Sequence, residues 1–307
     1  MNIGSTLYRK AMTTVAGNRA VKRLSLRYGR KLARRFVASD HLQGALREVA
    51  ALNRLGISAT MDALGEGIGS LDEARAYRDE YLKLLDAIAD SGVRANVSLK
   101  PTQMGLALDA DACFGHIREI VDRARQYGNF VRIDMEDSSC TQATIDMTVR
   151  LHREGLTNAG TVLQAYLKRT EGDARDLIEA GIPLRLVKGA YRESEAIAFQ
   201  RKADIRESFK SIVKLHLDRG VYTAIASHDD AIIGWTKQYA LQNGIAKGRF
   251  EFQMLYGLRM SEQARLAKEG YRVRCYVPYG TMWYPYYTRR LAEKPGNLWL
   301  VVKHLLR

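Results

Sequence analysis

Residues 276–293 read Tyr-Val-Pro-Tyr-Gly-Thr-Met-Trp-Tyr-Pro-Tyr-Tyr-Thr-Arg-Arg-Leu-Ala-Glu, and this stretch predicts the end of a strand followed by a short helix. The apolar run over residues 273–277 ends at a Pro/Gly break, which is typical of the end of a regular element. The aromatic and arginine-rich segment after the break has helical spacing. The stretch is therefore one strand-then-helix unit, and the preceding chain repeats that unit.

Short apolar runs alternate with longer helical patterns from residue 56 onward. Eight runs predict strands at residues 57–63, 95–99, 130–135, 161–167, 183–187, 222–226, 250–255 and 273–277. Helical patterns between them cover residues 71–91, 110–127, 142–154, 172–180, 194–218, 231–243 and 261–269. Strict alternation indicates a parallel sheet with helices packed outside, and eight units close a TIM-like (β/α)8 barrel of the α/β class.

A doubly wound open sheet is the alternative architecture for this alternation. It is disfavoured because no Gly-x-Gly-x-x-Gly follows an early strand; Gly65, Gly67 and Gly69 have a different spacing. No Pro- or Ser-rich linker divides the chain. We therefore predict one barrel domain over residues 51–307, preceded by a basic helical arm over residues 1–50.

The adjacent arginines of the last unit indicate a carboxylate clamp. Guanidinium groups are rigid, permanently charged forks that suit carboxylates, and Arg289 and Arg290 follow a run of aromatic residues. Glu293 lies one helical turn beyond Arg290 and can hold an arginine in place. On composition alone, a solvated basic turn explains the pair equally well, because charge runs usually only solvate a surface.

Polar residues also gather where the predicted strands end. Active sites of such barrels lie at the carboxyl ends of the strands, so these side chains are candidates for one site. Any single one of them is equally well explained as a structural polar group. They are Asp62, Glu66, Lys100, Asp134, Gln164, Arg185, Lys188, His228, Gln253 and Tyr276.

Composition excludes several classes of protein. Hydrophobic content is 46% and charged content 27%, as in ordinary globular domains. No apolar run approaches the ~20 residues that a membrane span needs, and no signal peptide is visible. The three cysteines are widely spaced and the six histidines lack zinc-type pairing, so we predict reduced thiols, no metal site and a cytoplasmic location.

The positive charge is concentrated at the N-terminus. Residues 1–39 hold ten basic residues and no acidic one, within a net charge of +14 for the whole chain. Apolar residues are interspersed at loosely helical spacing, a pattern suited to an anionic membrane surface. A helical cap that packs on the barrel explains the pattern equally well. No aromatic-rich binding motif accompanies the charge, so nucleic acid is not a predicted partner.

Three blocks of sequence resemble the proline dehydrogenase family, including the proline dehydrogenase domain of proline utilisation A. The family pattern of Tyr, Pro and Gly, followed by Tyr-x-x-Arg-Arg-x-x-Glu, falls on Tyr276, Pro278, Gly280, Tyr286, Arg289, Arg290 and Glu293. The blocks at residues 185–191 (Arg-Leu-Val-Lys-Gly-Ala-Tyr) and 251–257 (Glu-Phe-Gln-Met-Leu-Tyr-Gly) agree as well. The resemblance runs from about residue 51 to the end of the chain.

The resemblance implies a flavoenzyme of proline catabolism. Members of this family hold FAD noncovalently at the barrel mouth. Hydride passes from the proline ring carbon next to nitrogen to the flavin, and the product is 1-pyrroline-5-carboxylate. Electrons then pass to a membrane quinone, which implies a peripheral location on the inner face of the membrane. A separate pyrroline-5-carboxylate dehydrogenase would be the partner that consumes the product.

The resemblance also implies roles for particular residues around the substrate. Arg289, Arg290 and Lys100 match the three cations at the substrate carboxylate, and Asp134 matches an acid near the ring that we expect to pair with Lys100. Glu293 matches the acid that supports the arginine-bearing helix, and Glu66 matches a residue that pairs with Arg289 when the site is empty or closed. The apolar walls match Leu255, Ala190, Tyr191, Tyr276 and Tyr286.

For the flavin, the resemblance points to residues after the middle strands. Arg185 and Gln164 match residues that contact the flavin, and a cation there favours its reduced, anionic form. Lys188 and His228 match positions near the ribityl and phosphate groups. Relatives are expected to carry Thr-His-Asn where this chain has Ser227-His228-Asp229. The predicted cofactor set is Gln164, Arg185, Lys188, Gly189, Ala190, Ser227 and His228.

Three other functions remain open at this point. A flavin dehydrogenase for another cyclic imino acid would use the same site. A lysine aldolase would use Lys100 or Lys188 as a Schiff-base nucleophile. A membrane-associated binding protein without activity would depend on the basic arm, and the intact three-block resemblance disfavours it.

Overall fold

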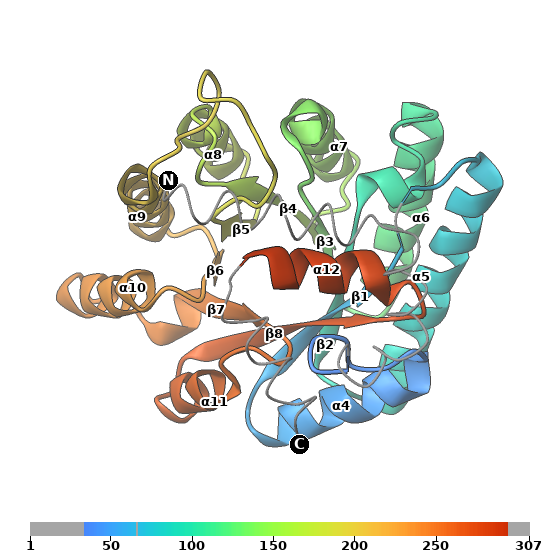
Figure 1. Cartoon of the computed structure of the whole chain (residues 1–307), viewed down its shortest axis with the longest axis horizontal. Helices are drawn as coiled ribbons and strands as arrows, with labels where there is room; N and C mark the ends of the chain where they lie inside the picture. The colour runs from blue at the N-terminus through green and yellow to red at the C-terminus, as the bar shows by residue number, and fades with distance from the viewer. Residues whose placement is uncertain (1–33, 66, 294–307) are drawn as a thin grey trace.

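Eight parallel strands form a closed barrel in the order β1 to β8 (Figure 1). The computed structural model describes residues 34–65 and 67–293, without the side chains at positions 289 and 291–293. β8 closes on β1 through six residue pairs, from Ser58 with Arg274 to Ala63 with Tyr279. The strands are β1 Ser58–Ala63, β2 Ala95–Leu99, β3 Val131–Ile133, β4 Ala159–Gln164, β5 Leu184–Val187, β6 Thr223–Ala226, β7 Phe250–Leu255 and β8 Arg272–Tyr279. The predicted (β/α)8 barrel is confirmed.

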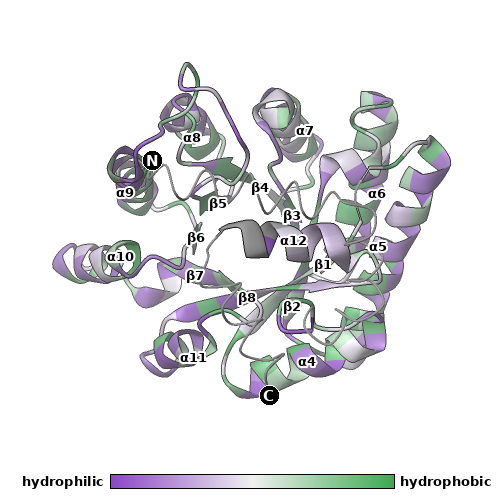
Figure 2. Cartoon of the chain, viewed as in Figure 1, coloured by the Kyte–Doolittle hydropathy of each residue, from purple (hydrophilic) through white to green (hydrophobic). Residues whose placement is uncertain are grey.

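Eight of the nine described helices surround the barrel and turn their apolar sides toward it, and the last one lies across one end (Figure 2). The nine are α4 Leu42–Arg54, α5 Leu71–Ser91, α6 Ala110–Gln126, α7 Thr141–Arg153, α8 Thr170–Glu179, α9 Lys202–Arg219, α10 Asp230–Gln242, α11 Met260–Lys268 and α12 Trp283–Glu293. Short 3-10 turns lie at η1 Pro101–Met104, η2 Ser138–Cys140 and η3 Lys247–Arg249. Within the described residues, no helix is long and apolar enough to cross a membrane.

Local sequence signals fix where the helices begin. Ser70 caps α5 because its hydroxyl accepts a hydrogen bond from the amide of Glu73 at 3.3 Å. Asp109 caps α6 by accepting from the amides of Asp111 and Ala112, each at 2.9 Å. These caps satisfy amides that have no partner inside the helix. The predicted helical ranges at residues 71–91 and 110–127 therefore agree closely with the observed elements.

The predicted helix at residues 194–218 is wrong in its first turns, because α9 begins only at Lys202. The preceding residues are held by the turn after β4. The amide of Phe199 donates to the carbonyl of Tyr166 at 2.7 Å, and Ala198 forms an isolated bridge with Leu167. Backbone groups used in that way cannot form helical hydrogen bonds. The segment between β5 and α9 therefore stays irregular.

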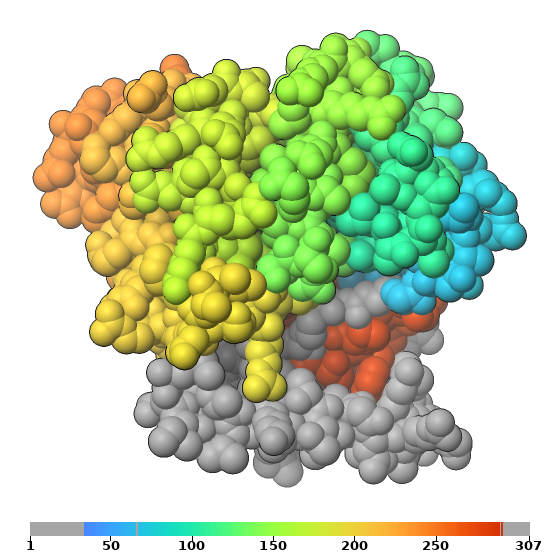
Figure 3. Space-filling view, turned by 90° about the horizontal axis from the view of Figure 1, so that it is seen from above, coloured from blue at the N-terminus to red at the C-terminus, as the bar shows by residue number. Residues whose placement is uncertain are grey.

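α12 lies across one end of the barrel rather than along its side (Figure 1). Its aromatic residues Trp283, Tyr284, Tyr286 and Tyr287 form a buried cluster with Phe36, Val37 and Leu64. The segment before α4 is also fixed to β8, since the amide of Ala38 donates to Pro278 O at 3.0 Å. In Figure 3 the yellow segment after β5 and the red helix α12 lie toward the same end of the molecule. This end is where the carboxyl ends of the strands open.

The predicted arm over residues 1–50 lies only partly within the described residues. From residue 34 onward it is packed on the barrel, and Val49 of α4 is fully buried. Residues 1–33, which carry most of the basic charge, lie outside the described residues. The arm's membrane-binding role therefore stays a prediction.

Candidate active site

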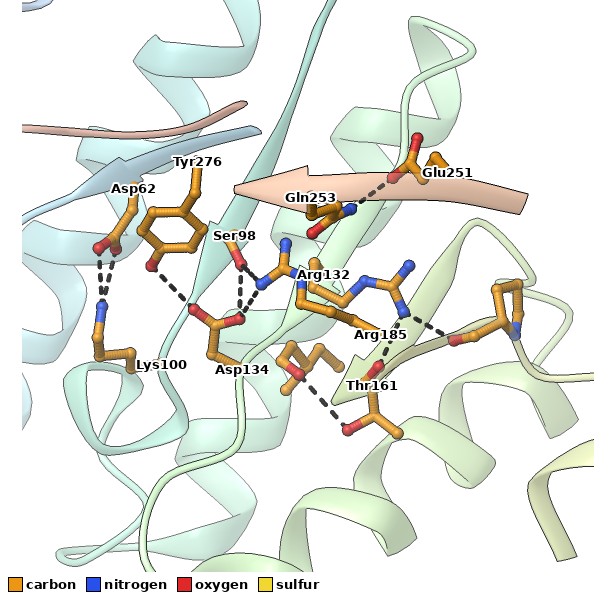
Figure 4. Close-up of polar contacts among 12 residues, drawn as sticks. Asp62, Ser98, Lys100, Arg132, Asp134, Thr161, Arg185, Glu251, Gln253 and Tyr276 are labelled. Atoms are coloured by element: carbon orange, nitrogen blue, oxygen red, sulfur yellow. Dashed lines mark hydrogen bonds and ion pairs between the residues drawn. The ribbon is translucent and has the colours of Figure 1, made fainter. Parts of the chain in front are cut away.

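Asp134 is the centre of a buried polar network at the carboxyl ends of the strands (Figure 4). It follows β3, and its Oδ1 accepts hydrogen bonds from Arg185 Nη1 at 2.6 Å and Ser98 Oγ at 2.7 Å. Its Oδ2 accepts from the hydroxyl of Tyr276 at 3.0 Å. Side chains from three strands, β2, β5 and β8, therefore converge on one carboxylate at the end of β3.

Arg185 enters this network from β5 and is only 4% exposed. Besides Asp134, its Nη1 donates to Ser98 Oγ at 3.1 Å, and the guanidinium lies 5.4 Å from the ring centre of Tyr276. Its Nε and Nη2 are buried and have no hydrogen-bond partner among the residues that the structure describes. A buried charged group whose N–H donors have no acceptor destabilises the folded protein. These two nitrogen atoms of Arg185 therefore suit a ligand that supplies hydrogen-bond acceptors.

Tyr276 stays protonated inside the network. Burial, reinforced by the nearby Asp134 carboxylate, raises the pKa of Tyr276 well above its usual value. The phenol therefore acts as a donor to Asp134 and presents a neutral ring. A neutral aromatic wall beside a charged clamp is what a ligand with an apolar body and a carboxylate requires.

Lys100 pairs with Asp62, not with Asp134. The predicted pairing of Lys100 with Asp134 is wrong, because Lys100 Nζ donates to both carboxylate oxygens of Asp62 at 2.9 Å. Asp134 is instead held by Arg185, whose fork reaches it from β5. Burial by itself would lower the pKa of Lys100, but the charges of Asp62, Asp134 and Glu136 and the hydrogen bond to Asp62 together outweigh it, so the pKa is raised. Lys100 remains a cation at the barrel mouth.

Two residues that the sequence interpretation missed hold this arrangement together. Tyr81 of α5 is fully buried, and its hydroxyl donates to Ser98 O at 2.7 Å and lies 3.2 Å from Asp62 Oδ1. Ser98 bridges Asp134 and Arg185 through its side chain. The period-two alternation of β2 places Ser98 on the same side as Lys100 and was a usable signal for it. No sequence signal distinguishes Tyr81 from an ordinary core aromatic.

The predicted cofactor residues near Arg185 in the sequence lie at or after the ends of the neighbouring strands β4 and β5. Gln164 ends β4, is 2% exposed and donates from Nε2 to Glu136 O at 2.8 Å. Lys188, Gly189, Ala190 and Tyr191 follow β5 in the irregular segment. Gly189 has φ 107°, and a Cβ there would lie 2.1 Å from the ring of Tyr166. Only glycine allows the chain to pass so close to that ring.

The Ser227-His228-Asp229 block forms a turn between β6 and α10. The amide of Leu255 donates to His228 Nε2 at 3.1 Å, so the imidazole proton lies on Nδ1 in the neutral ring. Ser227 Oγ accepts from the amide of Asp229 at 3.1 Å. The carboxylate of Asp229 in turn pairs with Arg206 at 2.8 Å. His228 and Leu255 are thus brought together from neighbouring strands.

Burial by itself would raise the pKa of Asp229, but the hydrogen bond and charge of Arg206 outweigh it and lower the pKa. Asp229 is therefore ionised at neutral pH. It also accepts from the amide of Ala231 at 3.0 Å, so this charge lies at the N-terminus of α10, where a negative charge is favourable.

The clamp helix α12 is described only in part. Tyr286 is 6% exposed, and Arg290 has its guanidinium 5.3 Å from the ring centre of Tyr286. The backbone of Arg289 and Glu293 lies in α12, but their side chains are outside the description, and so is all of Glu66. The predicted contacts among those three residues therefore stay predictions. Among the described residues, no group of three or more His, Cys, Asp or Glu could hold a metal ion.

Comparison with known proteins places the whole chain in one family. Residues 45–299 match the family model described as proline dehydrogenase. Proline dehydrogenase 1 of Bacillus subtilis strain 168 is 44% identical over 302 residues, covering 98% of this chain and 100% of that protein. The chain belongs to the proline dehydrogenase family. The proline dehydrogenase of Deinococcus radiodurans is 41% identical over 305 residues, covering 98% of each chain.

Solved structures of longer proteins share the barrel. Proline utilization A of Bdellovibrio bacteriovorus, inactivated by N-propargylglycine, matches with a TM-score of 0.81 at 25% identity. That match covers 89% of this chain and 33% of the other, so the chain spans about a third of that protein. Proline utilization A of Corynebacterium freiburgense, at 20% identity and a TM-score of 0.76, shares the fold. The proline dehydrogenase family resemblance of the three sequence blocks is therefore confirmed.

Proposed function

We propose that this protein oxidises L-proline to 1-pyrroline-5-carboxylate at the barrel mouth, with FAD as the hydride acceptor. The observation that carries the proposal is Arg185, a buried cation with two unsatisfied nitrogen atoms among the described residues, in a chain of the proline dehydrogenase family. A permanent cation with free donors is suited to a cofactor that becomes anionic on reduction.

The residues present fit FAD. Arg185 would face the flavin ring with its two unpartnered nitrogen atoms, and Gln164 would lie beside it at the end of β4. Lys188, Ala190, Ser227 and His228 would line its ribityl and phosphate groups, at the ends of β5 and β6. When bound, FAD would supply the two-electron acceptor that no side chain provides.

The protein's own residues would bind and orient the substrate. Lys100, Arg289 and Arg290 would hold its carboxylate, since charge-assisted hydrogen bonds are strong in a secluded site. Tyr276, Tyr286, Leu255, Ala190 and Tyr191 would form the walls around the ring. α12, with its buried aromatic cluster, would exclude water from the mouth of the barrel.

The lysine aldolase alternative with Lys100 as the nucleophile is disfavoured by the state of that lysine. A Schiff-base lysine must lose its proton, which requires a lowered pKa. Here burial opposes the charge on Lys100, but the hydrogen bond to Asp62 and the charges of Asp62 and its acidic neighbours together raise the pKa of Lys100. The lysine therefore acts as a cation for a carboxylate and not as a nucleophile. A flavin dehydrogenase for a different cyclic imino acid stays the second candidate.

The test of the proposed function is a substrate comparison with purified, FAD-supplemented protein and a soluble dye as electron acceptor. L-proline should support dye reduction with equimolar 1-pyrroline-5-carboxylate, at a kcat/KM above that for hydroxyproline or pipecolate. Faster oxidation of pipecolate would assign the protein to the second candidate. Dye reduction that does not depend on any imino acid would rule out both.

Tyr286 is expected to set the preference for proline over hydroxyproline. Its phenol is buried on α12 beside the guanidinium of Arg290, where it would crowd a hydroxyl on the substrate ring. Tyr286→Ser should narrow the ratio of the two kcat/KM values, mainly by lowering KM for hydroxyproline. Tyr284→Ser in the same aromatic cluster is the control. An unchanged ratio in Tyr286→Ser would place the selective wall elsewhere.

We propose that membrane quinone is the electron acceptor and that residues 1–33 bring the enzyme to anionic membranes. Each basic residue near such a surface contributes about 1 kcal/mol, and this attraction fades within a Debye length of ~10 Å. The consumer of the product would be a separate pyrroline-5-carboxylate dehydrogenase.

Truncation directly before Arg34 tests the arm, because it keeps Phe36 and Val37 in their buried cluster. The shortened protein should sediment less with anionic vesicles and reduce quinone more slowly on them, while dye-linked activity persists. Unfolding or loss of dye-linked activity would instead identify the arm as a structural cap.

A further inference from the structure

Among the described residues, the interior of the barrel holds a buried cation that no carboxylate pairs with. The three buried carboxylates of the described chain each have their own cation at 2.6 to 2.9 Å. Arg132 on β3 is a further buried cation, and it has no acidic partner within ion-pair distance among the described residues. The three pairs are Lys100–Asp62, Arg185–Asp134 and Arg274–Glu251.

Arg132 is held by neutral groups only. It is 3% exposed, and its Nη1 donates to Thr161 O and Pro183 O, each at 2.8 Å. Its guanidinium lies 4.8 Å from the ring centre of Phe130, and its Nε is buried without a partner in the described chain. Carbonyl dipoles solvate the charge but do not cancel it, so its field extends into the barrel.

The chain keeps space for this guanidinium. A Cβ on Gly160 of β4 would lie 2.7 Å from Arg132 Nη1 and 2.4 Å from Pro183 O. Any larger residue at position 160 would therefore displace the arginine or the backbone beside it. An apolar side chain at position 132 would destabilise the folded protein far less than the arginine does, because burying a charge without an ion-pair partner costs free energy.

Arg132 lies in the layer directly below the Asp134 network. Arg132 on β3 and Asp134 directly after it are two residues apart, so both side chains point into the barrel, one level apart. Figure 4 shows Arg132 and Arg185 next to each other, with Asp134 and Ser98 on the side of the barrel mouth. Burial, and after it the charge of Arg185, lowers the pKa of Arg132 to about 9. The guanidinium therefore stays charged at neutral pH.

We propose that Arg132 raises the reduction potential of the flavin bound above it. This inference rests on the proposed function. Transfer of a hydride breaks a C–H bond of the substrate, forms an N–H bond on the flavin, and adds one negative charge to the flavin ring. A fixed cation below the ring would stabilise that anion more than the neutral oxidised form, because Arg132 is 3% exposed and its buried charge is weakly screened. Arg185 contacts the network directly, whereas Arg132 acts only through its field.

The test is the midpoint potential of the bound flavin, measured by spectroelectrochemistry on the holoenzyme. Arg132→Met and Arg132→Gln remove the charge, and Arg132→Lys keeps it. The neutral variants should shift the equilibrium toward oxidised flavin about tenfold, which for a two-electron couple corresponds to about −30 mV. Arg132→Lys should stay close to the unmodified protein. Arg118→Met, at a half-exposed arginine paired with Glu154 on the outside of the barrel, is the control for net charge and should leave the potential unchanged.

The possible results distinguish an effect of the charge of Arg132 from an effect of its packing. An unchanged potential in Arg132→Met would overturn the inference, and so would an equal shift in Arg132→Met and Arg132→Lys. Should the neutral variants not fold, Glu251→Gln removes a nearby anion and should shift the potential upward; no shift or a downward shift there would also overturn it. Failure of the unmodified protein to bind flavin would count against the proposed function, not against the role of Arg132 in tuning it.

Discussion

Asp134→Ala should lower the free energy of unfolding by about 3–5 kcal/mol, the usual cost of breaking a buried ion pair. The substitution leaves Arg185, which is 4% exposed, without its carboxylate, and it also removes the acceptor for Ser98 and Tyr276. Denaturant unfolding of the flavin-free protein measures the change directly. Flavin binding should weaken in the same variant, because Arg185 would no longer be held in one orientation.

Two further variants show whether the loss of stability in Asp134→Ala comes from the buried ion pair. Asp134→Asn keeps the shape of the side chain and should lower the free energy of unfolding less than Asp134→Ala does. Glu171→Ala removes an exposed pair with Arg175 at 2.7 Å on α8 and should change stability far less, since exposed pairs contribute little. If Asp134→Ala were no more destabilising than Glu171→Ala, the network would not be the desolvated site described above.

Arg290→Met should raise KM for L-proline by about 10- to 100-fold while flavin stays bound. A charged hydrogen bond contributes about 1.5–3 kcal/mol, and each 1.4 kcal/mol is a factor of ten. The guanidinium lies beside Tyr286 on the helix that crosses the barrel mouth, so its loss acts on the substrate rather than on the flavin. Steady-state kinetics with a soluble dye measure KM, and the absorption spectrum measures flavin content.

Arg289→Met should raise KM for L-proline by a similar factor if both arginines bind the same substrate carboxylate. Arg265→Met, on the exposed side of α11, is the matched control and should leave KM unchanged. A KM near that of the unmodified protein in both clamp variants would exclude the clamp.

The order of elements could be predicted from the sequence because the hydrophobic pattern acts locally. Runs such as residues 95–99 and 250–255 coincide with β2 and β7, and the Ser70 and Asp109 caps mark helix starts. The irregular segment before Lys202 could not be predicted. Its helical composition is overridden by hydrogen bonds to Tyr166 and Lys168, which are distant in sequence.

The pairing of side chains inside the barrel was predictable only in part. Lys100 and Asp134 are both at strand ends, so the sequence places them at one rim. Strand order does not decide which carboxylate Lys100 reaches, because β2 lies between β1 and β3 and is next to Asp62 on one side and Asp134 on the other. The side-chain geometry decides it, and Lys100 pairs with Asp62. Tyr81 and Arg132 carry no pattern of their own, since a tyrosine on a helix and an arginine in a strand are usually ordinary packing or surface residues.

The most direct test of flavin-linked proline oxidation is an absorption spectrum taken without oxygen, before and after addition of L-proline. Flavin bands are expected in the purified or FAD-reconstituted protein. These bands should bleach on addition of L-proline, with one equivalent of 1-pyrroline-5-carboxylate formed per flavin. A protein that stays colourless after reconstitution, or whose flavin bands are unchanged by L-proline, would contradict it.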